Sequence, residues 1–349
     1  MKKDENLQRE YEKLKEFETK EIKIGKILGQ GAYGLVAEVK YKKEIYAGKF
    51  IKKEGNSGES ELIKQFKSPY IVKIIKIFES KSGLYNFVLM EKADLKDLNS
   101  FINNRNHNAQ QIIIDCPYDG IVSDNLMKYF TKHLVYGLEA LERIGFSHFD
   151  IKPGNILIFN KYILKLSDFS FLKRQKDLVK NNLLLIPGGS NGYSPPEYYL
   201  NKLTTLENAK RHDYFSLGST LFFLKYGKRL IDFPYYYAEK SREKKIEIID
   251  YIYNILQRQI NLIKASKLSS KGFINFLSGL IQYNPEDRLN FEEIYRDKWL
   301  NSNREEINKL FHINEANNSK LIQELNKSDF LLDKRKELDK NRKKFKFKK

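Results

Sequence analysis

An acid and an amide stand five positions apart in the segment His148-Phe-Asp150-Ile-Lys152-Pro-Gly-Asn155, directly before a short apolar run. Transfer of a phosphoryl group needs a carboxylate that orients and deprotonates the attacking hydroxyl, a cation near the phosphate, and oxygen ligands for magnesium. Asp150, Lys152 and Asn155 could supply these functions in that order. The competing interpretation is a capping loop, in which Asp150 and Asn155 only satisfy backbone groups.

A second acid, Asp168, lies thirteen positions after Asn155 and immediately follows an apolar run that predicts a strand. A carboxylate at the end of a strand is well placed to bind a hard cation. Taken alone, such a residue is more often an ordinary turn residue. Together, Asn155 and Asp168 predict a magnesium site.

Glycines with the spacing G-x-G-x-x-G-x-V occur early in the chain, at Gly29, Gly31 and Gly34, followed by Val36. A dinucleotide-binding fold would need the third glycine to open a helix. Here the pattern lies between two β-type runs, and such a loop can fold over a triphosphate and offer its backbone N–H groups. A plain hairpin turn is the alternative, because this spacing alone is a weak signal.

Lys49 lies in an otherwise apolar run that predicts a strand, and a lysine buried there needs an anionic partner. Glu59 falls on the apolar face of the helix predicted at 59–66, whereas Glu61 points away from that face. We therefore pair Lys49 with Glu59 and keep Glu61 as the less favoured partner. Alternatively, Lys49 points outward from an exposed sheet.

The elements that must position these residues form a β-rich first part and a helical second part. β-type runs predict strands at 24–28, 35–41, 45–51, 71–79, 85–90, 156–159 and 163–166. Helical periodicity predicts helices at 59–66, 95–102, 123–143, 214–224, 244–256 and 273–281. The pattern predicts an α+β fold in which a small sheet with one helix precedes a larger, mostly helical region.

Composition places the chain among intracellular globular proteins. Its 349 residues are 41% hydrophobic, which supplies a sizeable core. Cys116 is the single cysteine, so an internal disulfide is excluded and a reducing compartment is expected. No apolar run approaches the ~18 residues of a membrane span, so we expect a cytoplasmic or nuclear protein. The net charge of +18 suits proteins that meet phosphates, acidic peptides or anionic lipids.

The order and spacing of these motifs resemble the eukaryotic-type protein kinases over residues 22–300. The matching motifs are the glycine pattern at Gly29, A-x-K at Lys49, H-x-D-x-x-x-x-N at His148 and D-F-x at Asp168. In addition, P-P-E ends at Glu197 where A-P-E is usual, Asp213 looks like the family's buried aspartate, and Arg288 resembles the late arginine that would pair with Glu197. These last three residues are structural in the family, so we assign them to stability.

The resemblance implies a two-lobed fold with a small β-rich N-lobe that carries one main helix and a larger, mostly α-helical C-lobe. We expect a charged N-terminal extension at 1–20, the N-lobe at 21–92, the C-lobe at 93–300 and a basic tail at 301–349. A polar insertion would interrupt the C-lobe at about 103–121.

The resemblance also places ATP and Mg2+ in the cleft between the lobes. Residues implied to contact ATP are Leu28, Gly29, Gly31, Gly34, Val36, Ala47, Lys49, Glu91, Ala93 and Leu157. Adenine would lie between apolar side chains of the N-lobe and Leu157, with its edge at the backbone of Glu91 and Ala93 and with Met90 gating the space behind. Asn155 and Asp168 would hold magnesium.

The function implied is transfer of the γ-phosphate of ATP to serine or threonine hydroxyls of a protein substrate, with Asp150 as catalytic base. Lys152, two positions later, is similar to serine/threonine kinases rather than tyrosine kinases. The main alternative is a pseudokinase scaffold, which binds nucleotide and partners without phosphoryl transfer and typically lacks a chemical residue. None of the expected residues is missing, which favours the enzyme. They are Lys49, Glu59, Asp150, Asn155 and Asp168.

Two positions depart from the usual pattern of the family. Phe149 replaces the arginine that in many kinases binds a phosphorylated activation loop, and 171–189 contains no Ser, Thr or Tyr. Ordering of this loop by phosphorylation is therefore not expected. Ser170 replaces the usual glycine after Asp-Phe, which restricts positive φ but leaves the metal ligand intact.

The last ten residues, KNRKKFKFKK, carry seven positive charges and no negative ones. Lysines interleaved with Phe345 and Phe347 could contact nucleic acid weakly, lie on an anionic membrane or serve as a nuclear import signal. The plainer interpretation is a solvated basic tail. Nucleic-acid binding as the whole function would leave the ordered catalytic motifs unexplained.

Overall fold

The structure is a computed structural model. It describes residues 11–12, 14–31, 34–52, 68–80, 83–103, 122, 124–180, 183–184, 188–199, 205–232, 242–266 and 269–302. The chain divides into two compact units, 1–302 and 303–349, and all described residues belong to the first. The helix predicted at 59–66 lies outside the described residues, as do nearly all of the insertion and the basic tail.

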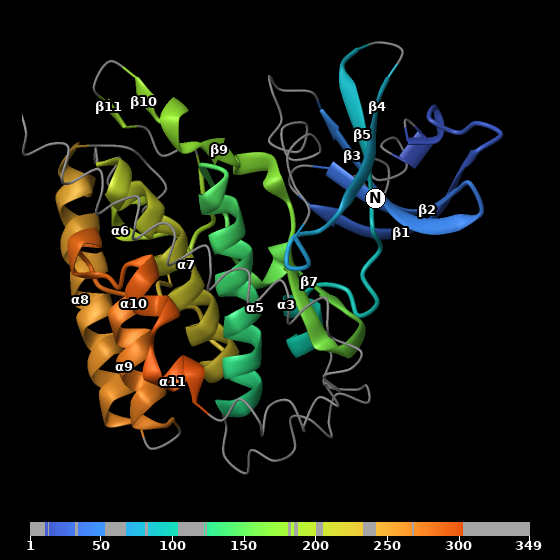
Figure 1. Cartoon of the computed structure of the whole chain (residues 1–349). Helices are drawn as coiled ribbons and strands as arrows, with labels where there is room; N and C mark the ends of the chain where they lie inside the picture. Colours follow the sequence, from blue (N-terminus) through green and yellow to red (C-terminus); the bar gives the residue numbers. More distant parts are fainter. Residues whose placement is uncertain are drawn as a thin grey trace, which may run out of the picture. The chain divides into compact units, whose positions relative to one another are not determined.

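The first part of the chain forms a five-stranded antiparallel sheet in the order β1-β2-β3-β5-β4 (Figure 1). Its strands are β1 (Ile22–Gly31), β2 (Gly34–Tyr41), β3 (Glu44–Lys52), β4 (Ile74–Glu79) and β5 (Tyr85–Met90). All five predicted strands are present, although β1 is longer than predicted and β4 begins later. Buried and less buried residues alternate along β2, so that one face of the sheet packs in a core.

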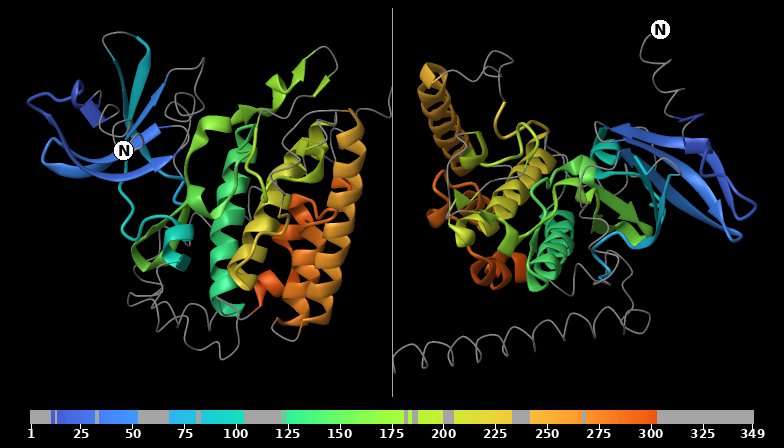
Figure 2. Two further views of the ribbon diagram at one scale, coloured as in Figure 1. Left: turned by 180° about the vertical axis from the view of Figure 1, so that it is seen from behind. Right: turned by 90° about the horizontal axis from the view of Figure 1, so that it is seen from above.

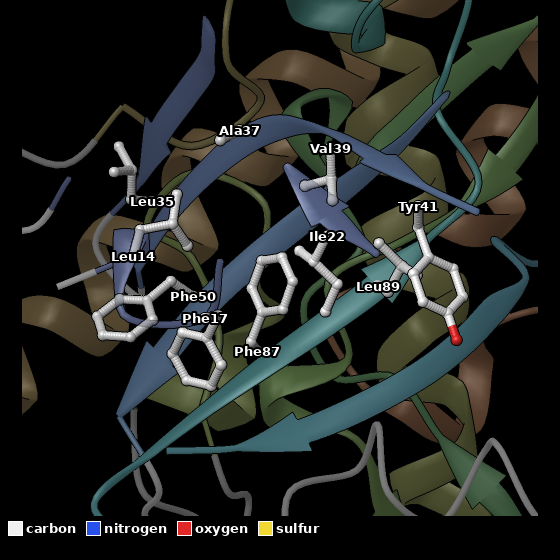
Figure 3. Packing of buried hydrophobic residues seen from close by; sticks show 10 residues of the cluster. All are labelled: Leu14, Phe17, Ile22, Leu35, Ala37, Val39, Tyr41, Phe50, Phe87 and Leu89. Carbon is white, nitrogen blue, oxygen red and sulfur yellow. The ribbon is translucent and has the colours of Figure 1, made fainter. Parts of the chain in front are cut away.

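The segment before β1 covers that face of the sheet. Leu14 is fully buried and Phe17 is 8% exposed, and the Phe17 ring stacks on Phe87 at a centroid distance of 5.2 Å (Figure 3). Glycine at position 48 makes room for this stack, because a Cβ there would overlap the Phe87 ring. Within the charged extension expected at 1–20, Leu14 and Phe17 are therefore part of the core of the sheet. Tyr11, Leu14 and Phe17 recur at helical spacing within the charged segment and form its apolar face.

The second part of the chain is mostly helical, and the sheet lies to one side of its long helices in all views (Figure 1 and Figure 2). The helices are α3 (Leu98–Asn103), α5 (Asp124–Arg143), α6 (Pro196–Tyr199), α7 (Leu206–Tyr226), α8 (Arg242–Ala265), α9 (Lys271–Leu280), α10 (Phe291–Tyr295) and α11 (Lys298–Asn301). Helix α7 begins well before the predicted position 214 because the Thr205 side chain caps its N-terminus by accepting from Asn208 N.

Short strands carry the loops that contain the predicted chemical residues. Strand β6 (Phe146–Ser147) pairs with β9 (Lys173–Arg174), β7 (Ile156–Phe159) with β8 (Ile163–Leu166), and β10 (Val179–Lys180) with β11 (Leu183–Leu184). Because β7 and β8 form a hairpin, the loop before β7 and the loop after β8 lie at the same end of it. The fold is therefore α+β and two-lobed, as predicted.

His133 of α5 is a buried histidine that stays neutral in the folded protein. Its Nδ1 accepts a hydrogen bond from Leu164 N at 3.2 Å, and the rings of Tyr129 and Tyr70 lie 4.2 and 5.2 Å from it. Burial, with a contribution from the charge of Lys132, lowers the pKa of His133 from 6.5 to about 3. Below pH 6.5 the unfolded chain therefore binds a proton that the folded protein does not bind.

This difference predicts an acid-sensitive fold. The contribution of His133 to the free energy of unfolding is fully present above pH 6.5 and is lost as the pH falls toward 3. At pH 5 the loss amounts to about 2 kcal/mol. Urea unfolding at pH 7 and pH 5 should reveal the loss, and His133→Asn, which keeps an acceptor for Leu164 N, should reduce it. An equal loss in the variant would assign the acid sensitivity to other groups.

Candidate active site

A cavity of about 650 Å3 is lined by the sheet, by the segment after β5 and by the β7–β8 hairpin. Eight of the ten residues predicted to contact the nucleotide line it, namely Leu28, Gly29, Gly34, Val36, Ala47, Lys49, Ala93 and Leu157. The two predicted metal ligands, Asn155 and Asp168, line it as well. Gly31 and Glu91 are not among the lining residues. The structure thus brings most of the predicted site into one cavity.

The glycines of the pattern lie at the end of β1 and at the start of β2. Gly29 pairs with Val36 and Gly31 pairs with Gly34 across the two strands. Gly34 has φ 147, and a Cβ at this position would overlap the carbonyl oxygen of Phe50. Glycine is therefore required at position 34 for β2 to lie against β3 at the edge of the cavity.

Lys49 points into the cavity and is only 7% exposed. Its Nζ lies 2.6 Å from Asp168 Oδ1 and donates to Ser170 Oγ at 3.1 Å. The alternative in which Lys49 points outward from the sheet is therefore wrong. The predicted partner, Glu59, lies outside the described residues, and among the described residues Asp168 supplies the negative charge that a buried lysine needs.

Asp168 is held by three hydrogen bonds from two residues. Lys49 Nζ and Ser170 Oγ donate to its Oδ1, both at 2.6 Å, and Ser170 N donates more weakly at 3.4 Å. Burial raises the pKa of the Asp168 carboxyl, but the charge of Lys49 and these hydrogen bonds outweigh it and lower the pKa to about 2. Asp168 is therefore ionised at neutral pH. Ser170, expected only to restrict the backbone, also acts through its hydroxyl.

Asp150 lies in a network of four side chains. Its Oδ2 accepts from Lys152 Nζ and Asn155 Nδ2, both at 2.8 Å, and its Oδ1 accepts from Ser190 Oγ at 2.6 Å. Lys152 Nζ also donates to Ser190 Oγ at 2.6 Å. The capping-loop alternative accounts for the bond from Asn155 Nδ2 to Asp150 O at 2.9 Å, but not for the side-chain network.

Ser190 is a site residue that the sequence did not predict. It lies forty positions after Asp150, in a segment without helical or strand periodicity. The one available signal was a hydroxyl beside a glycine pair, shortly before the Pro-Pro-Glu197 motif. That signal does not by itself indicate a contact with the acid.

Asp213 of α7 holds the loop that contains Asp150. Its Oδ2 accepts from His148 N at 2.7 Å and its Oδ1 accepts from Phe149 N at 2.8 Å. Phe149 has φ 64, a region that aromatic residues rarely adopt, and the two hydrogen bonds help to offset the cost of this conformation. Asp213 thus has a supporting position, as predicted from the sequence.

A buried ion pair joins α6 to the segment before α10. Arg288 Nη1 and Nη2 donate to Glu197 Oε1 and Oε2 at 2.6 and 2.7 Å, which is the predicted pair. Burial raises the pKa of the Glu197 carboxyl, but the charge and hydrogen bonds of Arg288 outweigh it and lower the pKa below its usual value. The guanidinium also donates to the carbonyl oxygens of Gln282 and Tyr283. The buried charge of Arg288 is therefore hydrogen-bonded to two backbone carbonyls as well as to Glu197.

Phe149 forms an apolar cluster where the resemblance would place an arginine. The side chain is fully buried and packs with Leu178 and Ala209, with Phe171 at the edge of the cluster. The ring of His212 lies 5.1 Å from that of Phe149. This cluster connects the loop before β7, the segment after β8 and helix α7 through apolar contacts.

Glu91 and Asp97 flank the segment that links the two lobes. The Glu91 carboxylate accepts from Lys165 Nζ at 2.8 Å through each oxygen, and its backbone N–H donates to Lys73 O at 3.0 Å. No hydrogen bond from the described part of the chain occupies the backbone carbonyl of Glu91, so this group can accept from a ligand. Asp97 lines the cavity and accepts from Ser100 N and Oγ at 2.8 and 2.6 Å. The sequence did not single out Asp97.

Comparison with known proteins gives one consistent result. A profile of the protein kinase domain matches residues 22–300. The serine/threonine-protein kinase AtPK1/AtPK6 of Arabidopsis thaliana is 26% identical over 296 residues, which is 80% of this chain and 55% of the plant protein. The serine/threonine-protein kinase cds1 of Schizosaccharomyces pombe is 28% identical over 244 residues, which is 69% of this chain and 47% of the yeast protein.

The chain spans about half the length of these curated relatives. Similarity to the 3-phosphoinositide-dependent protein kinase 1 of Arabidopsis thaliana is 25% and covers 67% of this chain and 51% of that protein. Within the described part of the chain, no helix has the length and apolar character needed to span a bilayer.

Proposed function

Since the chain belongs to the protein kinase family, we propose that it is an ATP-dependent kinase that phosphorylates serine or threonine hydroxyls of other proteins. The observation that carries the proposal is the network in which Asp150 contacts Lys152, Asn155 and Ser190. A loop that only capped backbone groups would not need a lysine and a hydroxyl on the same carboxylate.

Each charged residue of the site has a separate role in the proposed reaction. Asp150 accepts the proton of the substrate hydroxyl as its oxygen attacks the γ-phosphorus and the bond to the departing ADP breaks. Lys152 lies beside Asp150 and offers positive charge to the transferred phosphoryl group. Lys49, with Asp168 as its partner, contacts the phosphates from the sheet side of the cavity. A lysine two positions after the catalytic acid supports the serine/threonine class.

Asp168 and Asn155 fit a magnesium ion by their chemistry. Asp168 uses Oδ1 for Lys49 and Ser170, and among the described residues no hydrogen bond occupies its Oδ2. Asn155 uses Nδ2 for Asp150, which leaves its amide oxygen. Mg2+ commonly takes one or two protein oxygens and completes its shell with phosphate oxygens and water. Bound there, it would neutralise charge on the phosphates.

We expect this kinase to be active without phosphorylation of its activation segment. The Phe149 cluster holds this segment by apolar contacts, and the Ser190 hydroxyl is engaged with Asp150 and Lys152. Ser194 is 1% exposed and its hydroxyl donates to Ser190 O at 3.0 Å, so Ser194 is inaccessible to a modifying kinase. Phosphatase-treated protein should therefore keep its transfer rate. Activity that appears only after phosphorylation of Ser190 or Ser194 would contradict this expectation.

Transfer of radiolabelled γ-phosphate from ATP to generic protein acceptors tests the proposed function. We expect labelling of serine and threonine that requires Mg2+ and stops when the ion is chelated. Stabilisation by ADP, measured as a rise in Tm, should accompany the activity. Protein that is folded and stabilised by ADP but transfers nothing would support the scaffold alternative, in which the same cavity binds nucleotide without chemistry.

Ser190→Ala should lower kcat by roughly ten- to a hundredfold, the effect of losing one hydrogen bond to a charged group. The substitution removes a donor to Asp150 Oδ1 and an acceptor for Lys152 Nζ, while KM for ATP should change little. Ser190→Thr keeps the hydroxyl and is the matched control. Initial rates at varied ATP separate the two parameters, and an alanine variant as fast as the threonine variant would exclude this role.

The basic tail stays a prediction, because residues 303–349 lie outside the described residues. We propose weak contact of KNRKKFKFKK with nucleic acid or with an anionic membrane. Deleting residues 335–349 and measuring salt-dependent binding to both partners separates these possibilities from a solvated tail, for which neither binding would change.

A further inference from the structure

Arg229 lies in the loop after α7 and packs against the segment that contains Ser190. Its Cδ lies 2.8 Å from the position that a Cβ on Gly192 would occupy, and burial raises the pKa of the Tyr193 hydroxyl while the nearby charge of Arg229 opposes that rise. Gly192 has φ 87, where any other residue would be strained, so this close approach depends on glycine. Although Arg229 is exposed, its side chain is thus held at a defined place.

This place is close to the catalytic acid. Ser190 Oγ donates to Asp150 Oδ1 at 2.6 Å, which puts the segment against the catalytic loop. Gly192 follows two residues later, so the Cα atoms of Ser190 and Gly192 are at most about 7 Å apart. A peptide whose hydroxyl reaches Asp150 can therefore place a neighbouring residue near Arg229.

The charges around Arg229 favour an acidic residue in the substrate peptide. Among the described residues, no carboxylate forms an ion pair with Arg229. Lys152 adds a second cation on the catalytic loop. An exposed arginine whose aliphatic part is packed in place is well suited to bind a carboxylate, because its planar guanidinium can donate two hydrogen bonds to it.

We propose that Arg229 determines substrate specificity by binding an aspartate or glutamate within three positions of the phosphorylated serine or threonine. This inference rests on the proposed kinase activity, since it names the class of protein that the same site accepts. The proposal concerns recognition of a substrate side chain near the acceptor hydroxyl and not the chemistry at Asp150.

Peptides with one serine in a neutral background test the proposal. Glutamate or lysine is placed in turn at each of the three positions before and after the serine, and kcat/KM is measured for each peptide. We expect glutamate at one of these positions to raise kcat/KM by about tenfold or more over alanine, the size of a charge-assisted hydrogen-bond contact. Arg229→Ala should abolish the preference, and Arg229→Glu should transfer it to lysine at the same position.

The adjacent cation provides the matched control. Lys228 is also exposed, and its ammonium lies 5.9 Å from the centroid of the Phe222 ring. Lys228→Glu makes the same charge change and should keep the glutamate preference. Equal rates for all peptides, or a preference that survives in Arg229→Ala, overturn the proposal while phosphorylation of the neutral peptide still supports the kinase. If the intact protein phosphorylates no peptide at all, the proposed function itself fails.

Discussion

Replacing Asp150 with asparagine is expected to lower kcat for phosphoryl transfer by roughly a hundred- to ten-thousandfold. Asparagine has nearly the same shape and keeps an oxygen that can accept from Lys152 or Ser190, but it cannot take up the proton of the substrate hydroxyl. Because the side-chain hydrogen bonds that the described residues donate to this carboxylate come from Lys152, Asn155 and Ser190, affinity for ADP should change by less than about threefold. Initial rates and calorimetric binding of ADP measure the two quantities.

An exposed acid distant from the chemistry controls for the change of charge. Asp250 of α8 is exposed, and Asp250→Asn should leave kcat unchanged. If Asp150→Asn keeps more than about a tenth of the activity, the assignment of Asp150 as catalytic base is wrong. A large loss of ADP affinity together with kcat would instead indicate that the variant disturbs the whole cavity.

The largest expected effect on stability is at Arg288. Arg288→Met should lower the free energy of unfolding by about 3 to 5 kcal/mol, because it leaves the Glu197 carboxylate buried without a partner. It also removes the donors to the carbonyls of Gln282 and Tyr283. Trp299 is the single tryptophan and is 6% exposed, so its fluorescence during urea unfolding reports the loss directly.

Two further variants test whether the loss of stability in Arg288→Met comes from the buried, unpaired charge of Glu197. Arg296 forms an exposed ion pair with Glu292, and Arg296→Met should cost at most about 1 kcal/mol. Replacing both Glu197 and Arg288 with methionine should recover part of the single-variant loss, because no unpaired charge then remains buried. A loss of less than about 1 kcal/mol in Arg288→Met would mean that water or a neighbouring group compensates Glu197.

The sequence predicted which residues meet around Asp150 because their spacing is local. Asp150, Lys152 and Asn155 lie within six positions, and a hairpin of two apolar runs brings Asp168 to the same end. Such spacing follows from backbone geometry, which can be read from residue types. The strands and the long helices were predicted for the same reason, from the alternation or helical recurrence of their apolar residues.

Contacts between distant segments could not be predicted in this way. Lys49 and Asp168 are 119 positions apart, and helical periodicity pointed to Glu59, which stays a prediction. Ser190 and Arg229 lie in irregular segments, where no period indicates which way a side chain points. The start of α7 was missed for a related reason, since the Thr205 cap extends the helix through residues that lack strong apolar periodicity.

The covering of the sheet by Leu14 and Phe17 affects where this protein can be shortened. The family match begins at residue 22, so a chain cut at that boundary would look complete by comparison with its relatives. It would nevertheless lose two buried apolar side chains, each of which contributes about 1.5 to 3 kcal/mol when fully buried. The Phe87 ring, which packs against Gly48 next to Lys49, would then be exposed to water. For this chain, the functional domain has to be counted from the helical turn before β1, and kinetic constants measured on a shorter protein would describe a damaged sheet.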